Sequence, residues 1–118
     1  MIRFKKLDHV AIMIPVGKKD EARTFYGGTL QLKEIPGNHP RGAIWYEIAD
    51  IQLHLVEEEG DAKISGRHPA FEVTGLEAAK AYLQSKGIEI AYSSKITGRE
   101  RLFFRDPFNN RIELLEFE

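Results

Sequence analysis

The 118-residue sequence contains no cysteine, and this absence excludes three kinds of chemistry at once. The chain can form no disulfide, it can bind no metal through a thiolate, and it has no cysteine nucleophile. The first nine residues, MIRFKKLDH, also lack the apolar stretch and the cleavage site of a signal peptide. Together these absences predict a cytoplasmic protein.

Long apolar runs and an excess of one charge are missing as well. No stretch approaches the length of about 20 residues that a membrane-spanning helix needs. The formal net charge is −1, and the basic residues are scattered rather than interleaved with aromatic ones. Neither nucleic acid nor a membrane is therefore expected as a partner. With 42% hydrophobic and 30% charged residues, residues 1–118 have the composition and length of a single globular domain.

Strand and helix patterns alternate along the chain in an order that occurs twice. The first half predicts a strand over 7–14, a helix over 17–30, a turn-rich connection around a short strand over 33–42, and a hairpin over 43–48 and 51–57. The second half predicts a strand over 67–74, a helix over 75–87, and three strands over 88–93, 99–105 and 111–117. A polar linker, EEEGDAKISG, separates them and divides the domain into halves 1–59 and 60–118.

A single offset of 59 residues relates the two halves. It pairs His9 with His68 and His54 with Glu113, and it also pairs the two glycines expected to end the helices. Two copies are too few for a solenoid, which needs three or more. The sequence therefore predicts a duplicated α+β domain in which each half follows the order strand, helix, strand, strand, strand.

Four polar residues lie opposite the apolar faces of the predicted strands: His9, His54, His68 and Glu113. Any one of them alone is more often structural, held by a hydrogen-bond partner. All four share one strand face and one repeat offset, which favours a divalent metal site of imidazoles and a carboxylate, suited to Zn, Ni, Mn, Co or Fe(II). Three ligands are sufficient, so His54 is the least necessary. His39, in a loop rich in proline and glycine, is expected to face solvent.

The segments LDHVAIMIP, ARTFYGGTLQL, RHPAFEV and FFRDPFNNRIELLE resemble the vicinal oxygen chelate superfamily, which includes glyoxalase I, bleomycin-resistance proteins and extradiol dioxygenases. The resemblance covers essentially the whole chain. It implies paired βαβββ modules that form a curved mixed sheet around a metal cleft, commonly in a homodimer. Carried over by position, it implies a metal bound by His9, His54, His68 and Glu113, with Glu113 as the candidate catalytic base.

Departures from glyoxalase I narrow the expected activity. His54 stands where that enzyme has a glutamate, and the residues that would contact glutathione are replaced by Met13, Glu58 and Ile64. The resemblance therefore implies a lyase- or isomerase-like enzyme that acts on a small oxygen-chelating substrate without glutathione. A dioxygenase is less favoured, because its additional catalytic histidine and tyrosine have no counterpart that can be placed here.

Four residues share the cleft side of their strands and are expected to line the substrate pocket, with Trp45 as a fifth candidate: Met13, Gln52, Arg101 and Phe103. Two other functions stay open. One is a binding protein of the bleomycin-resistance type, which sequesters a ligand without catalysis. The other is a domain with a filled cleft that only dimerises. The cleft could form within one chain or across a swapped dimer.

Overall fold

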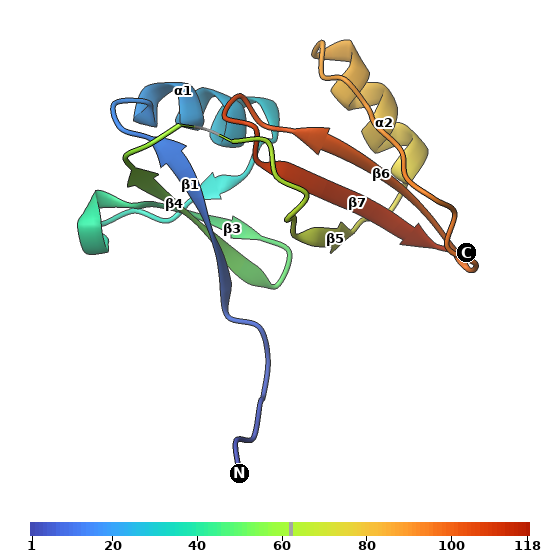
Figure 1. Ribbon diagram of the computed structural model, residues 1–118, viewed down its shortest axis with the longest axis horizontal. Helices are drawn as coiled ribbons and strands as arrows, with labels where there is room; N and C mark the ends of the chain where they lie inside the picture. Colours follow the sequence, from blue (N-terminus) through green and yellow to red (C-terminus); the bar gives the residue numbers. More distant parts are fainter. Residues whose placement is uncertain (62) are drawn as a thin grey trace. The chain divides into compact units, whose positions relative to one another are not determined.

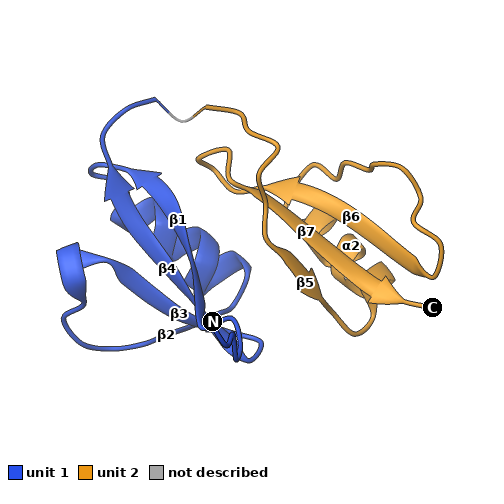
Figure 2. Cartoon of the chain, turned by 60° about the horizontal axis from the view of Figure 1, so that its bottom comes forward, with its two compact units in different colours: residues 1–61 blue, residues 62–118 orange. Residues whose placement is uncertain are grey.

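The computed structural model describes residues 1–61 and 63–118. The chain divides into two compact units, residues 1–61 (unit 1) and residues 62–118 (unit 2), and each contains one sheet (Figures 1 and 2). No helix within the described ranges is long and apolar enough to cross a membrane.

Unit 1 is built on a four-stranded sheet in the order β1-β4-β3-β2. β1 (His9–Pro15) runs parallel to β4 (Ile51–Glu58), and β4 is joined to β3 (Ile44–Ile48) by a tight antiparallel turn. The remaining elements are β2 (Lys33–Glu34), α1 (Lys19–Arg23) and two short helical segments, η1 (Thr24–Thr29) and η2 (Pro40–Gly42). Alternate residues of the strands meet the helical segments in the core, which includes Ile14, Tyr26 and Leu55.

The helix predicted over 17–30 forms over 19–29, but its second half is not an α-helix. The α-helix ends at Arg23 and continues as a wider π-helical turn, in which the amide of Leu30 donates to the Phe25 carbonyl at 2.8 Å. This turn brings the backbone of Gly27 against Tyr46, where an added Cβ would lie 3.3 Å from the tyrosine oxygen. A side chain at position 27 would therefore have to displace the Tyr46 hydroxyl by a few tenths of an ångström.

Unit 2 is built on a three-stranded sheet in the order β5-β7-β6. β5 (Ala70–Glu72) runs parallel to β7 (Arg111–Phe117), and β6 (Arg99–Arg105) pairs antiparallel with β7. The helix α2 (Leu76–Ser85) packs against β6 and β7. The strands predicted over 99–105 and 111–117 are confirmed.

Two strand predictions in unit 2 are wrong in extent. The segment 88–93 forms no strand, and one antiparallel bridge joins Ala91 to Phe103. The strand predicted over 67–74 is reduced to three residues, because Pro69 has no amide hydrogen to donate and the ladder begins after it. His68 therefore lies in the loop that leads into β5.

A carboxylate from the last strand of each unit holds the start of that unit's helix. In unit 2, Glu116 accepts hydrogen bonds from the amides of Gly75 (2.8 Å) and Leu76 (3.0 Å). In unit 1, Glu57 accepts one from the amide of Gly17 at 2.7 Å. These backbone bonds lower the pKa of both carboxyls. The two glutamates are related by the 59-residue offset, so the repeat extends to a shared capping contact.

Candidate functional site

Four aromatic rings form a continuous stack in unit 1. The ring of His9 on β1 lies 4.1 Å from that of His54 on β4, and the ring of His54 lies 3.9 Å from that of Trp45 on β3. His39 closes the stack at 4.1 Å from Trp45. The three strands are neighbours, and Trp45 and His54 pair directly across β3 and β4, so side chains on one sheet face come into contact.

His39 was predicted to face solvent, but the structure places it partly inside unit 1. Its side chain is half-buried against Trp45, and its Nε2 donates to the carbonyl oxygen of Ile35 at 2.8 Å. The loop that carries His39 folds back over β3, where His39 contacts Trp45. A loop rich in proline and glycine gives no local sequence signal for this contact. His39 therefore supports the ring of Trp45.

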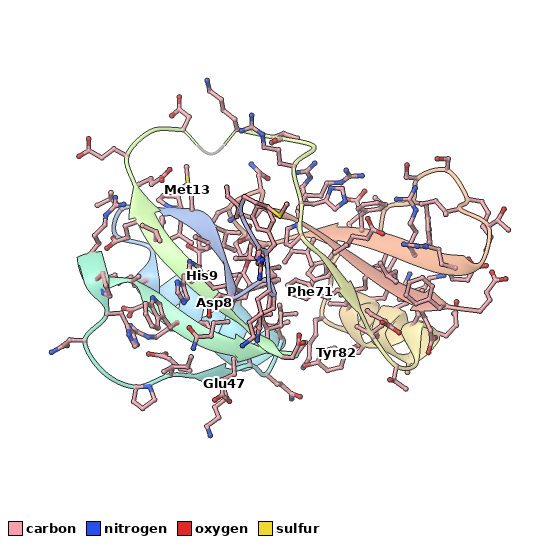
Figure 3. All side chains as sticks on the ribbon, turned by 90° about the horizontal axis from the view of Figure 1, so that it is seen from below. Asp8, His9, Met13, Glu47, Phe71 and Tyr82 are labelled. Atoms are coloured by element: carbon pink, nitrogen blue, oxygen red, sulfur yellow. The ribbon has the colours of Figure 1, made fainter. Side chains whose placement is uncertain are left out.

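The nitrogen atoms of the other two histidines have defined partners. Nδ1 of His9 lies 2.9 Å from Oδ2 of Asp8, and this bond lowers the pKa of the aspartate (Figure 3). Nε2 of His54 donates to the amide oxygen of Gln52 at 2.9 Å. Burial lowers the pKa of His54, with a smaller contribution from the charge of His9. Because Nε2 donates the bond to Gln52, Nδ1 is the nitrogen that carries the lone pair in the neutral ring.

Unit 2 brings His68 and Glu113 into direct contact. Nε2 of His68 lies 2.9 Å from Oε1 of Glu113, and its Nδ1 lies 2.8 Å from the carbonyl oxygen of Gly66. Glu113 sits in the middle of β7, opposite Ala70 and Phe103, and is only 4% exposed. Both ring nitrogens face acceptor atoms. A doubly protonated ring satisfies this arrangement, and so does a ring with a cation at Nε2.

Two arginines surround this pair. Nη1 of Arg101 lies 3.5 Å from Oε1 of Glu113 and partly neutralises the buried carboxylate. The guanidinium of Arg111 stacks 3.8 Å from the centre of the Phe103 ring, and its Nη1 is 3.4 Å from Nδ1 of His68. The ring of His68 meets Phe103 edge-on at 5.2 Å. The buried ring of Phe103 thus contacts the imidazole of His68 and the guanidinium of Arg111.

The structure thus assembles the predicted site residues in two groups, one per unit. His9 and His54 contact each other, with Trp45 and Gln52 bound to His54. His68 and Glu113 contact each other, with Arg101 and Phe103 beside them. Met13 lies on β1, half-buried, on the same strand face as His9. Among the described residues, no group of three or more histidine, aspartate or glutamate side chains is placed so that it could hold a metal ion.

Three residues beside the candidate site were missed by sequence reasoning. Asp8 and Gly66 each hold the second nitrogen of a histidine, and neither contact follows from strand alternation because both residues precede their strands. Arg111 was recognisable, since it lies two residues from Glu113 and so on the same face of β7.

Each of the two units contains a parallel strand pair, an antiparallel strand pair and helical segments, so the chain is a duplicated module. The chain belongs to the Glyoxalase/Bleomycin resistance protein/Dioxygenase superfamily, whose sequence profile matches residues 6–114. A Bacillus anthracis protein described as a glyoxalase family protein is 33% identical, with a TM-score of 0.91, and the match covers 100% of this chain and 99% of that one. The predicted family and the α+β curved-sheet class are therefore confirmed.

More distant solved structures share the fold. Lactoylglutathione lyase from Agrobacterium tumefaciens is 17% identical, with a TM-score of 0.75, over 94% of this chain and 92% of that one. TnmS3, an antibiotic-binding protein from Streptomyces sp. CB03234, is 19% identical, with a TM-score of 0.77, over 100% of both chains. A comparison with curated proteins gives no significant match. The fold therefore serves both an enzyme and a binding protein.

Proposed function

We propose that this chain is a metal-dependent enzyme of lyase or isomerase type that acts on a small substrate with two chelating oxygen atoms. The contact between His68 and Glu113 carries the proposal. Nε2 of His68 and Oε1 of Glu113 are atoms of two kinds that bind divalent metals, and they lie 2.9 Å apart.

The second nitrogens of the histidines support the same proposal. A metal-binding histidine commonly donates its other ring N–H to a carbonyl or a carboxylate, which fixes the ring. His68 does so to the carbonyl of Gly66, and the Nδ1 of His9 is held by the carboxylate of Asp8. Both residues then keep Nε2 for the metal.

His54 is the fourth proposed ligand, and it requires a local change. Its Nε2 is bonded to Gln52, so it would bind through Nδ1 or release the amide. The proposal is the same whether the two donor pairs come from one chain or from two copies in a homodimer.

The proposed reaction needs a Lewis acid, a base and a site that excludes water. A bound divalent ion, such as Zn, Ni, Mn, Co or Fe(II), would supply a Lewis acid for the substrate oxygens. Glu113 is the candidate base and would take a proton from the carbon next to a chelated oxygen. Nη1 of Arg101 lies 3.5 Å from Oε1 of Glu113, and Phe103, which is buried, shields this carboxylate from water.

Glutathione is not part of the proposed substrate. Met13, Glu58 and Ile64 stand at the positions where glyoxalase I is expected to contact it, and they offer two apolar groups and a negative charge. A negatively charged thiol peptide would be repelled by Glu58 and its acidic neighbours in the sequence.

Elemental analysis of protein purified without a histidine tag tests the metal. We expect about one equivalent of a divalent metal in the wild type and a large loss in His68→Ala and Glu113→Gln. The matched control is His39→Ala, which removes a histidine of the ring stack outside the donor set and should keep the metal. A wild-type protein that takes up none of Zn, Ni, Mn, Co or Fe(II) on incubation would contradict the proposal.

The ring stack of unit 1 favours one alternative, a binding protein that sequesters a ligand. His9 ends the stack with a half-exposed side chain, and flat rings of this kind can hold an aromatic ligand by stacking. A metal-free protein that still binds a ligand would support this alternative, because sequestration needs neither a base nor a Lewis acid.

A further inference from the structure

The sheet of unit 2 carries a group of arginines on the face opposite α2, which covers its other face (Figure 2). Glu116 of β7 caps α2, so the strand residues in register with it lie on the helix side and their neighbours alternate to the opposite face. The arginines of that opposite face are Arg99, Arg101 and Arg105 of β6 and Arg111 of β7. Phe103 is the one residue of β6 on this face that is not an arginine.

The carboxylates of this face do not balance its arginines. Of the described acidic residues, Glu113 alone forms an ion pair with any of the four, at 3.5 Å from Nη1 of Arg101, and it is also bonded to His68. Glu72 of β5 shares the face but pairs with none of them in the described part of the chain. Half-buried arginines without a counter-charge are unusual, because a desolvated cation is normally paired.

Unpaired donor atoms show the same deficit. The Nε atoms of Arg99 and Arg101 are buried, and no described residue accepts a hydrogen bond from either of them. A buried donor without an acceptor is unfavourable, since it has lost its bonds to water and gained none in return. The face therefore offers more N–H groups and more positive charge than the chain itself uses.

Arg101 and Arg111 converge on the ring of Phe103. Their guanidinium carbons lie 5.2 Å and 3.8 Å from the centre of that ring. The backbone fixes one nitrogen of each group: Nη2 of Arg101 donates to the carbonyl of Ser94 at 2.8 Å, and Nη1 of Arg111 donates to that of Gly66 at 3.3 Å. Nε and Nη2 of Arg111 have no acceptor among the described residues. This free edge is a fork of the kind that binds a carboxylate through two parallel hydrogen bonds.

The other two arginines of the face are placed differently. Arg105 donates to the carbonyls of Asn109 and Ser65, so its guanidinium holds two loops. Arg99 lies over the ring of Phe117, near the end of the sheet, at 4.6 Å from the ring centre. The unused binding capacity beside Phe103 therefore belongs to Arg101 and Arg111.

We propose that Arg101 and Arg111 bind the carboxylate of a small organic acid beside the ring of Phe103. This inference rests on the proposed function and names its substrate class, an acid whose other oxygen atoms chelate the metal. The two arginines adjoin His68 and Glu113, so one small molecule can reach both places. The negative charge of Glu113 repels a dianion more than a monoanion, which favours a carboxylate over a phosphate.

Titration of the metal-free full chain with propanoate tests the site. Propanoate carries one carboxylate and no second chelating oxygen, so its binding is independent of the metal, and a failure of the metal proposal is detected separately by elemental analysis. The arginine Nε–H signals in proton–nitrogen correlation spectra report the contact. At constant ionic strength we expect saturable shifts of the Arg101 and Arg111 signals with propanoate, none with neutral propanamide, and weaker binding of methyl phosphate.

Three outcomes of this titration overturn the proposal. The first is a wild-type protein without saturable shifts up to about 100 mM propanoate. The second is an equal response to propanamide, which would mean that the carboxylate is not recognised. The third is tighter binding of methyl phosphate, which would assign the site to a phosphate.

Substitutions test which residues bind the probe. Arg111→Gln should raise the Kd for propanoate at least tenfold, and Arg111→Lys and Arg101→Lys, which keep the charge but not the fork, should each raise it severalfold. The matched control is Lys86→Gln, which removes a positive charge at the end of α2 and should change the Kd less than twofold. Circular dichroism identifies the folded variants. Folded arginine variants that bind as tightly as the wild type, or an equal loss in Lys86→Gln, overturn the proposal.

Discussion

Replacing Glu113 by alanine should lower the free energy of unfolding of the metal-free protein more than a substitution of a surface residue does. The carboxylate is buried, it is bonded to His68, and it faces Arg101, whose side chain is 15% exposed. Removal of one partner of a buried ion pair costs about 3–5 kcal/mol, because the other charge is left uncompensated. Arg101 keeps a hydrogen bond to the carbonyl of Ser94, so we expect the lower end, about 3 kcal/mol.

Differential scanning calorimetry in the presence of a chelator measures this loss. With an unfolding entropy of about 2.1 cal/mol/K per residue, the 118 residues give about 0.25 kcal/mol/K. A loss of about 3 kcal/mol therefore lowers Tm by about 12 °C. Glu113→Gln keeps an acceptor for His68 but not the charge, and it should lose roughly half as much.

Glu100→Ala is the matched control. Glu100 lies in the same sheet, but its side chain is 66% exposed and its partner is the surface residue Lys95. Surface ion pairs contribute little, so this variant should keep nearly the wild-type Tm. If Glu113→Ala lowers Tm no more than Glu100→Ala does, the buried carboxylate is not the electrostatic centre of unit 2, and the reasoning is refuted.

Two further predictions concern the core and the helix caps. The pKa of Glu116 is lowered by the amides of Leu76 and Gly75, so its contribution to stability is present above the ordinary glutamate pKa and is lost as the pH falls through the lowered value. Urea unfolding should therefore show Glu116→Gln less stable than the wild type at pH ~7, with a difference that shrinks as the pH is lowered through the acid range, and a constant difference would contradict the cap. Tyr46→Phe should keep or raise Tm, because the buried hydroxyl has no partner in the described part of the chain and an unpaired hydroxyl costs about 1–3 kcal/mol. A clear fall in Tm would mean that the hydroxyl has a partner.

The sequence predicted the faces of the strands better than the ends of the elements. Strand alternation predicted that His54 and Glu113 lie on the face opposite Leu53, Leu55 and Ile112. Both are themselves buried, and Leu115, on the same face as Glu113, is buried too. The π-helical turn at Thr24–Thr29 was not predictable, since it depends on contact between Gly27 and Tyr46, which lie far apart in the chain.

The sequence singled out the residues of the candidate site but not the groups that contact them. The repeat offset, which pairs His68 with His9 and Glu113 with His54, identified both residues as candidates. The structure shows His68 and Glu113 in contact. The ring stack depends on the return of a loop, which carries His39 over Trp45. The contact of Gly66 with His68 uses a backbone carbonyl, an atom that every residue carries and that no sequence pattern distinguishes.

The ring stack also gives this protein a built-in optical reporter. Trp45 is the one tryptophan of the chain, and its indole lies between the imidazoles of His39 and His54. Indole emission depends on the groups in contact with the ring, so an event that shifts His54 changes the fluorescence without any label. Unit 2 carries no tryptophan and is silent at the same wavelength. Titrations followed by this signal would therefore report on the surroundings of Trp45.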